Sequence, residues 1–282
     1  MRKACVRIYP YQNSSPMAKK SILITGVYGL VGSIIYKRLL KSPEAFEVFG
    51  MDRSSHMSDR VSKEEFIEVP ADRFFQSDLA DMDRLIKLFV GKDTVVHMAG
   101  NPNTEASWDS LLENNICGGY HVLEAAKRAG VSRVVLASTI QVSTGYARFV
   151  EPYKYIPVGE FDKVPETFDP IKTTDAPWPI NLYAASKVFC ETLARVYSSS
   201  SDLSCICLRI GAVNSKDEHP KHLSPLYCSQ NDIGRLAECC INAPDSLKFD
   251  IFYGMSANKY LWPDIANAEK AVGYIPEDKS SY

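Results

Sequence analysis

The sequence predicts an α/β fold with a doubly wound parallel sheet and a small C-terminal lobe. Short apolar runs alternate with segments of helical periodicity along most of the 282 residues, which is typical of parallel strands joined by right-handed helical crossovers. Hydrophobic residues make up 45% of the chain and charged residues 23%, the composition of a globular protein that buries a large core. Glycine and polar residues directly follow several apolar runs, at the sheet edge where ligands of such folds bind.

The apolar and helical patterns divide the chain into elements in a regular order. Strands are predicted at residues 21–25, 46–51, 74–76, 94–98, 133–137 and 203–210, and helices at 30–40, 81–89, 108–129 and 182–197. Asp81 is expected to cap the second helix and Gly130 to end the third. Residues 53–72 are expected to form a loop that carries a short strand. Residues 140–180 show no clear period, so this long segment is expected to cover another part of the molecule.

Charge and cysteine content exclude several classes of function. The net charge is −2, so there is no basic field for nucleic acid. No apolar run approaches the roughly 20 residues that span a bilayer, so no membrane partner is expected. The eight cysteines show no metal-ligand spacing and no secretory signal precedes them, so reduced thiols and a cytoplasmic location are expected. Residues 1–18 are predicted to be a flexible extension, with an organellar presequence as the less favoured alternative.

Three glycines follow the first predicted strand and open the first predicted helix. In this setting Gly26 would form a tight turn, Gly29 would let a pyrophosphate approach the backbone, and Gly32 would let the helix pack on the strand. Asp52 lies at the end of the second strand, where its carboxylate can accept both ribose hydroxyls and would repel a 2′-phosphate. NAD is therefore favoured as the cofactor, and NADP remains an alternative because Arg53 could pair with a phosphate.

A second group of residues points to acid–base chemistry. Tyr183 and Lys187 form Tyr-x-x-x-Lys at the start of a predicted helix, and residues four apart share one helix face. An ammonium group beside a phenol stabilises the phenolate, which could remove the proton of a sugar hydroxyl while hydride leaves the same carbon. The hydroxyl of Thr139, at the end of the fifth strand, could polarise the same oxygen.

In combination, these motifs resemble the extended short-chain dehydrogenase/reductase family of NAD-dependent epimerases and dehydratases, whose fold is the Rossmann type. Further matching pieces are Asp78-Leu79, His97-Met98-Ala99-Gly100, Asn115-Ile116-x-Gly118, Ser138-Thr139 and Arg209-Ile210-Gly211. The resemblance implies that Tyr183 is the base and that Lys187 also holds the nicotinamide ribose. It also implies that Asn115 braces the helix near the Lys187 proton relay, and that Thr139 stands where the family has its catalytic serine or threonine. The cofactor-binding residues that it implies are Gly26, Tyr28, Gly29, Leu30, Val31, Gly32, Asp52, Arg53, Asp78, Leu79, Met98, Ala99, Gly100, Ala137, Tyr183, Lys187, Ile210 and Ala212.

Within that family the chain is most similar to uronate dehydrogenases and their neighbours. The resemblance implies a domain over residues 19–210 that binds NAD and carries the catalytic tyrosine and lysine, followed by a small substrate-binding lobe over residues 211–282 that does not fold independently. The implied substrate-binding residues are Asn101, Thr139, Gln141, Tyr183 and Lys221. Lys221 stands where uronate dehydrogenases use an arginine to bind the substrate carboxylate, and a lysine cannot offer a bidentate fork. Family likeness also suggests a homo-oligomer formed through the two long helices.

The remaining candidates have simpler structural explanations. His97 lies at the end of a buried strand and is expected to be a hydrogen-bonded core residue. His219 and His222 lack a third ligand, so no metal site is predicted.

Three functions remain open on the sequence. The favoured one is an NAD-dependent dehydrogenase of a small sugar or sugar acid. The second is an epimerase or dehydratase that keeps its NAD bound, and the third is a non-catalytic dinucleotide sensor, which is disfavoured because both Tyr183 and Lys187 are present.

Overall fold

The structure is a computed structural model that describes residues 19–221 and 223–280, so Cys5, His222 and the extension predicted for residues 1–18 lie outside the described residues. Within them, seven strands form one parallel sheet in the order β3-β2-β1-β4-β5-β6-β7. The strands are β1 (Lys20–Thr25), β2 (Phe46–Asp52), β3 (Phe74–Gln76), β4 (Thr94–His97), β5 (Arg133–Thr139), β6 (Ser204–Ile210) and β7 (Phe249–Gly254). The α-helices are α1 (Leu30–Leu39), α2 (Met82–Phe89), α3 (Trp108–Leu111), α4 (Gly118–Ala129), α5 (Thr144–Phe149), α6 (Leu182–Ser200), α7 (Gln230–Ile241) and α8 (Ala266–Val272). The α/β class predicted from the sequence is confirmed.

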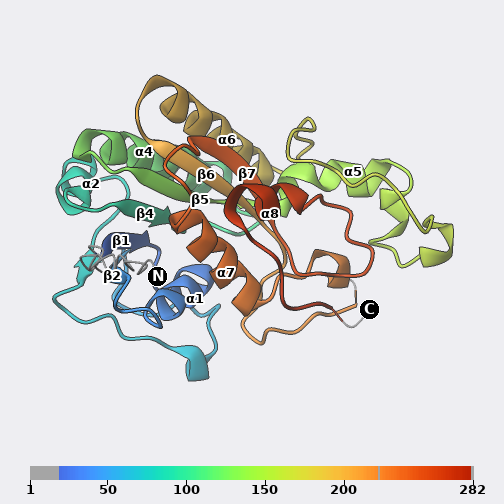
Figure 1. The fold of residues 1–282 in the computed structure, drawn as a ribbon, viewed down its shortest axis with the longest axis horizontal. Coiled ribbons are helices and arrows are strands. Elements are labelled where there is room, and N and C mark those ends of the chain that lie inside the picture. Colours follow the sequence, from blue (N-terminus) through green and yellow to red (C-terminus); the bar gives the residue numbers. More distant parts are fainter. Residues whose placement is uncertain (1–18, 222, 281–282) are drawn as a thin grey trace, which may run out of the picture.

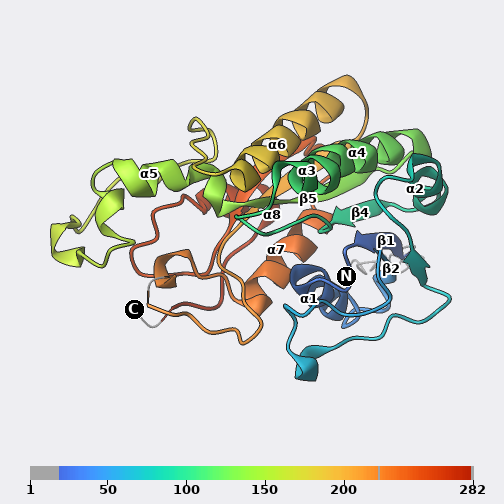
Figure 2. The ribbon, with the colours of Figure 1, turned by 180° about the vertical axis from the view of Figure 1, so that it is seen from behind.

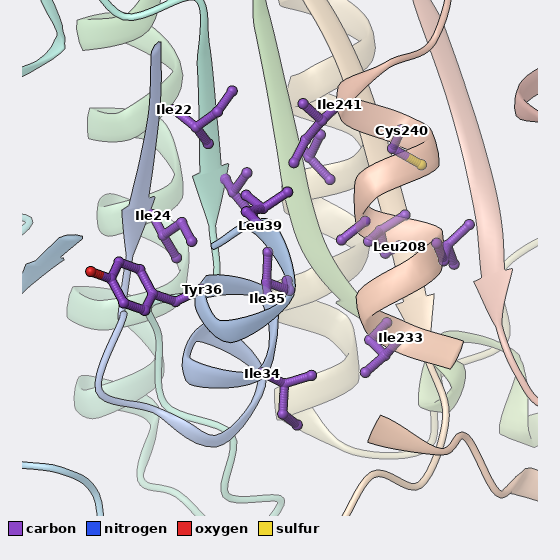
Figure 3. Packing of buried hydrophobic residues seen from close by; sticks show 14 of the residues in the cluster. Ile22, Ile24, Ile34, Ile35, Tyr36, Leu39, Leu208, Ile233, Cys240 and Ile241 are labelled. Carbon is purple, nitrogen blue, oxygen red and sulfur yellow. The ribbon is translucent and has the colours of Figure 1, made fainter. Parts of the chain in front are cut away.

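Helices cover both faces of the sheet (Figures 1 and 2). Because successive strand residues point to opposite faces, Ile22 and Ile24 of β1 pack with α1 and α7, whereas Leu23 between them packs with α2, α4 and α6. Figure 3 shows the first of these two cores, with Ile35 of α1 and Ile233 of α7 directed toward the strands. A parallel sheet buried on both faces accounts for the continuous apolar runs in the sequence.

The order of the strands creates a crevice beside β1. From β1 the chain builds outward through β2 and β3, then returns to the other side of β1 and builds outward through β4 to β7. The loops that leave the carboxyl ends of β1 and β4 therefore run in opposite directions, and ligands of open α/β sheets bind at this switch point.

A smaller third core lies beyond the carboxyl end of β7. Trp262 is fully buried there and packs with residues of the 140–171 segment, among them Ile140, Ile156 and Ile171. The backbone N–H of Ile171 donates to the carbonyl of Trp262 at 2.8 Å. The long segment of residues 140–180 thus packs against residues 253–265, and α5 forms part of the resulting lobe (Figure 1).

Several elements differ from the sequence-based expectation. The sheet continues past residue 210, because β7 pairs with β6, and α7 packs in the same core as α1. No strand forms within residues 53–72; that segment carries only a 3₁₀ turn, Lys63–Glu65, because β3 already pairs with β2 and ends the sheet there. The helix expected over residues 108–129 consists of α3, a π-helical turn at Leu112–Cys117 and α4.

In the described part of the chain, none of the helices combines the length and the apolar character needed to span a membrane.

Candidate active site

A cleft of about 950 Å³ opens at the carboxyl ends of the strands. It runs from the β1–α1 turn and the end of β2, across the ends of β4 and β5, to the first turns of α6 and the end of β6. The cleft therefore occupies the switch point of the sheet.

The glycine turn forms one wall of the cleft. Gly26 has a left-handed φ of +69°, and a Cβ built on it would lie 2.7 Å from the backbone nitrogen of Ala99. A Cβ on Gly32 would lie 2.1 Å from the carbonyl oxygen of Gly26. Gly29 is the N-cap of α1 and no side chain caps this helix end, so the first N–H groups of the helix stay available to an anion. Gly26 and Gly32 therefore leave no room for a side chain, and Gly29 lies at a helix N-terminus that no side chain caps.

Asp52 lies beside the turn at the end of β2. Its Oδ2 accepts a hydrogen bond from the backbone N–H of Tyr28 at 3.1 Å, and its Oδ1 accepts one from the N–H of Ser54 at 3.3 Å. Burial raises the pKa of the Asp52 carboxyl, and the backbone hydrogen bonds partly offset this by favouring the charged form. The Arg53 side chain is exposed and donates to Oδ1 of Asn114 at 3.4 Å.

Tyr183, Lys187 and Thr139 meet at the other end of the cleft. All three line it and are less than one-tenth exposed. Tyr183 and Lys187 lie one turn apart on α6, with the Lys187 ammonium nitrogen 6.0 Å from the centre of the Tyr183 ring. Oγ1 of Thr139 accepts the backbone N–H of Gln141 at 3.3 Å, which leaves the hydroxyl proton of Thr139 available to the cleft.

Asn115 supports this end of the site without lining the cleft. Its Oδ1 accepts from the N–H of Asn101 at 2.7 Å, and its Nδ2 donates to the carbonyl of Asn101 at 3.1 Å and to Oγ of Ser186 at 3.0 Å. The π-helical turn that contains Asn115 thereby connects the loop after β4 to α6, and such turns are frequent at functional sites.

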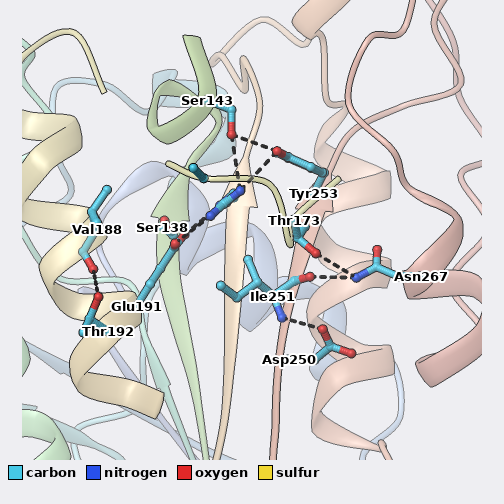
Figure 4. A network of polar contacts seen from close by, with 12 residues as sticks. Ser138, Ser143, Thr173, Val188, Glu191, Thr192, Asp250, Ile251, Tyr253 and Asn267 are labelled. Atoms are coloured by element: carbon cyan, nitrogen blue, oxygen red, sulfur yellow. Dashed lines mark hydrogen bonds and ion pairs between the residues drawn. The ribbon is translucent and has the colours of Figure 1, made fainter. Parts of the chain in front are cut away.

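A buried ion pair joins Glu191 of α6 to Arg209 of β6 (Figure 4). Glu191 of α6 receives two hydrogen bonds at 2.9 Å from the guanidinium of Arg209 and one at 2.6 Å from Oγ of Ser138. Nη1 of Arg209 donates to the hydroxyls of Tyr253, at 3.1 Å, and Ser143, at 3.3 Å. Burial by itself would lower the pKa of Arg209, but the hydrogen bonds and charge of Glu191 raise it above its ordinary value. This network connects α6, β5, β6 and β7 next to the site.

The structure brings most of the predicted site residues together. Those that line the cleft are Gly26, Tyr28, Gly29, Leu30, Val31, Gly32, Asp52, Arg53, Asp78, Leu79, Met98, Ala99, Gly100, Asn101, Ala137, Thr139, Gln141, Tyr183, Lys187, Ile210 and Ala212. Asn115 and Lys221 are not among the residues that line it. Lys221 is exposed on the segment before α7.

The loop after β2 contributes a set of lining residues that the sequence patterns did not predict. These are Ser54, His56, Met57, Ser58 and Arg60. The only signal for them was that this polar loop directly follows Asp52. Glu113 and Asn114 also line the cleft, and the π-helical turn that presents them had no recognisable sequence pattern.

His97 occupies the core position expected for it. It is 5% exposed, and its Nδ1 lies 2.8 Å from Oγ1 of Thr25. Burial, with a smaller contribution from the charge of Lys187, lowers the pKa of His97 to about 3, so the imidazole is neutral at physiological pH. Among the described residues, no group of three or more side chains is arranged to hold a metal ion.

Comparisons with known proteins agree with this geometry. The model of the NAD dependent epimerase/dehydratase family matches residues 22–241. An NAD-dependent glucose-6-phosphate dehydrogenase of Haloferax volcanii is 31% identical over 265 residues, which cover 92% of this chain and 94% of that protein. A uronate dehydrogenase of Pseudomonas syringae is 29% identical, covering 92% of this chain and 82% of the relative. The crystal structure of uronate dehydrogenase from Agrobacterium tumefaciens superposes with a TM-score of 0.73 at 27% identity, covering 94% of this chain and 86% of that one. The chain belongs to the NAD-dependent epimerase/dehydratase family. This follows from the match of its sequence to the family model, and its doubly wound sheet and the residues that line its cleft agree with it.

Proposed function

We propose that this enzyme is an NAD-dependent dehydrogenase of a small sugar or sugar acid, with Tyr183 as the general base. The observation that carries the proposal is the convergence of Tyr183, Lys187 and Thr139 in the cleft that begins at the glycine turn. Relatives that the chain covers over most of their length are named glucose-6-phosphate, L-arabinose 1- and uronate dehydrogenases. All three names describe oxidation of a small, single sugar.

The residues of the cleft fit NAD. The tight contacts of Gly26 and Gly32 bring the turn close to the strand ends, and the uncapped N-terminus of α1 suits a pyrophosphate. Asp52, Asp78 and Leu79 line the same cleft; Asp52 would bind the ribose hydroxyls, and Asp78 and Leu79 would contact the adenine. Met98, Ala99 and Gly100 line the next part of the cleft. Gly100 lies close to Lys187, because a Cβ built on Gly100 would be 3.6 Å from Nζ of Lys187.

The reacting end supplies a base, a cation and a hydrogen-bond donor. Tyr183 removes the proton of the sugar hydroxyl, and the ammonium of Lys187 stabilises the phenolate that precedes this transfer. The Thr139 hydroxyl donates to the same substrate oxygen and holds it in place. Bound NAD would supply the hydride acceptor. Ile210 and Ala212 would contact its nicotinamide.

The test is to supply NAD with a panel of aldoses, uronic acids and sugar phosphates and to follow NADH by absorbance. A dehydrogenase makes NADH accumulate, whereas an epimerase or dehydratase that retains NAD converts its substrate without a net change in absorbance. Tyr183→Phe should abolish turnover while NAD binding, measured by calorimetry, stays within about twofold of wild type. Tyr155→Phe is the matched control, because the Tyr155 hydroxyl donates to Glu151 and Tyr155 is not among the residues that line the cleft. Turnover of Tyr183→Phe near the wild-type rate would show that another group is the base.

We also propose that the chain forms a cytoplasmic homo-oligomer through α4 and α6. Leu182, Phe189 and Val196 recur at seven-residue spacing on α6 and are between 41% and 55% exposed, and Tyr120 of α4 is 42% exposed. Apolar side chains repeated along one helix face are typical of a helix-to-helix interface. Sedimentation equilibrium measures the mass in solution, and a monomeric mass would refute the proposal.

A further inference from the structure

Gln141 and Asn181 form a pair at the substrate end of the cleft. Gln141 follows β5 and lines the cleft, whereas Asn181 lies just before α6 and is not among the lining residues. Nδ2 of Asn181 donates a hydrogen bond of 2.7 Å to Oε1 of Gln141. Asn181 therefore acts on the cleft through Gln141.

The chemistry of one neighbour fixes which atom of Asn181 faces which partner. Asn181 is the N-cap of α6, and its side chain accepts the backbone N–H of Ala184 at 2.8 Å. The two ends of an amide can be told apart only by their partners. A backbone N–H can only donate, so Oδ1 must face Ala184. The NH₂ group of Asn181 must then face Gln141.

The orientation of the Gln141 side-chain amide follows from its hydrogen bond with Asn181. An NH₂ group at 2.7 Å requires an acceptor, so Oε1 of Gln141 faces Asn181. The Nε2 group of Gln141 then carries two N–H donors that make no hydrogen bond among the described residues. The main chain of Gln141 is also held, because its N–H donates to Oγ1 of Thr139 and its carbonyl accepts from Oγ1 of Thr144 at 2.9 Å.

We propose that Asn181 is a positioning residue: it orients the Gln141 amide so that Nε2 donates a hydrogen bond to an acceptor oxygen of the substrate. The residue that caps α6 would thereby also contribute to substrate recognition. The inference rests on the proposed function, since it concerns the substrate of that same site. Gln141 and Thr139 both line the cleft, as Tyr183 does, so Gln141 Nε2 and the Thr139 hydroxyl would then be two donors for the substrate.

Asn181→Asp separates the two roles of Asn181. Aspartate caps a helix as well as asparagine does, and its charge is favourable at the N-terminus of α6. A carboxylate cannot donate to Oε1 of Gln141, so the Gln141 amide should turn and present its oxygen to the cleft. Asn181→Ala removes both the cap and the donor.

The experiment compares Asn181→Asp, Asn181→Ala, Gln141→Ala and Gln141→Ala/Asn181→Asp on the sugar that wild type oxidises. We expect Asn181→Asp to raise KM by about tenfold, the effect of one lost hydrogen bond, with kcat within about twofold and Tm unchanged. Asn181→Ala should raise KM and also lower Tm. Gln141→Ala should raise KM to a similar extent, and the double variant should be no worse than Gln141→Ala.

Two results would overturn the inference. One is a wild-type KM in Asn181→Asp, which would make Asn181 a helix cap only. The other is a double variant whose KM rises by the product of the single effects, which would show that the two residues act independently. If wild type oxidises no sugar, the proposed function fails, and the Gln141 side-chain amide signals in NMR still test the pair. A shift of these signals in Asn181→Asp supports it, and unshifted signals refute it.

Discussion

Replacing Glu191 by glutamine should destabilise the protein far more than a single surface charge change. Glu191 accepts three hydrogen bonds, two from a guanidinium that is 1% exposed. Glutamine keeps one acceptor oxygen and loses the charge, which leaves the buried Arg209 cation uncompensated. Breaking one partner of such a pair costs about 3 to 5 kcal/mol, so we expect the free energy of unfolding to fall by about 3 kcal/mol.

Urea unfolding at constant pH and salt measures this change. Glu160→Gln is the matched control, because its ion pair with Lys163 is about half exposed and such pairs contribute about 1 kcal/mol or less. A Glu191→Met/Arg209→Met double variant should lose less stability than the sum of the single variants, because no unpaired charge remains buried. A loss below about 1 kcal/mol in Glu191→Gln, or strict additivity in the double variant, would refute the coupling of the two charges.

Two further predictions concern the first helix and the buried histidine. Gly32→Ala should lower stability by about 2 kcal/mol or more and weaken NAD binding, measured by urea unfolding and calorimetry, because its Cβ would lie 2.1 Å from a backbone carbonyl. Gly234→Ala in α7 is the control. A Cβ on Gly234 would lie 3.5 Å from the nearest atom, Cβ of Arg38, which is an ordinary van der Waals contact, so the variant should be neutral or up to about 1 kcal/mol more stable. For His97, whose pKa is lowered to about 3 in the folded state, the unfolded chain binds a proton below about pH 6.5 that the folded protein does not. Wild type should therefore lose about 2 kcal/mol more stability than His97→Asn between about pH 8 and about pH 5; equal losses by urea unfolding would contradict the neutral buried imidazole.

The order of strands and helices up to residue 210 could be predicted from the sequence because each element carries its own local pattern. Apolar runs predicted β1 to β6, and apolar side chains at helical spacing predicted α1, α2, α4 and α6. The elements that escaped prediction lacked such a pattern. β7 contains Asp250 and ends in Gly254, and α7 contains Gly234, so where these two elements pack depends on partners far away in the chain.

The glycine turn, Asp52 and the order of Thr139, Tyr183 and Lys187 could be predicted from the chain alone, because they depend on short-range spacing and on the position of residues at the ends of strands. The contacts between distant side chains became known only from the folded arrangement. These contacts join Gln141 to Asn181, Glu191 to Arg209, and Asn115 to Asn101 and Ser186. The folded arrangement also places Lys221 outside the cleft. Hydrogen bonds and ion pairs act over a few ångströms, and only the folded sheet brings residues that are far apart in the chain within that range.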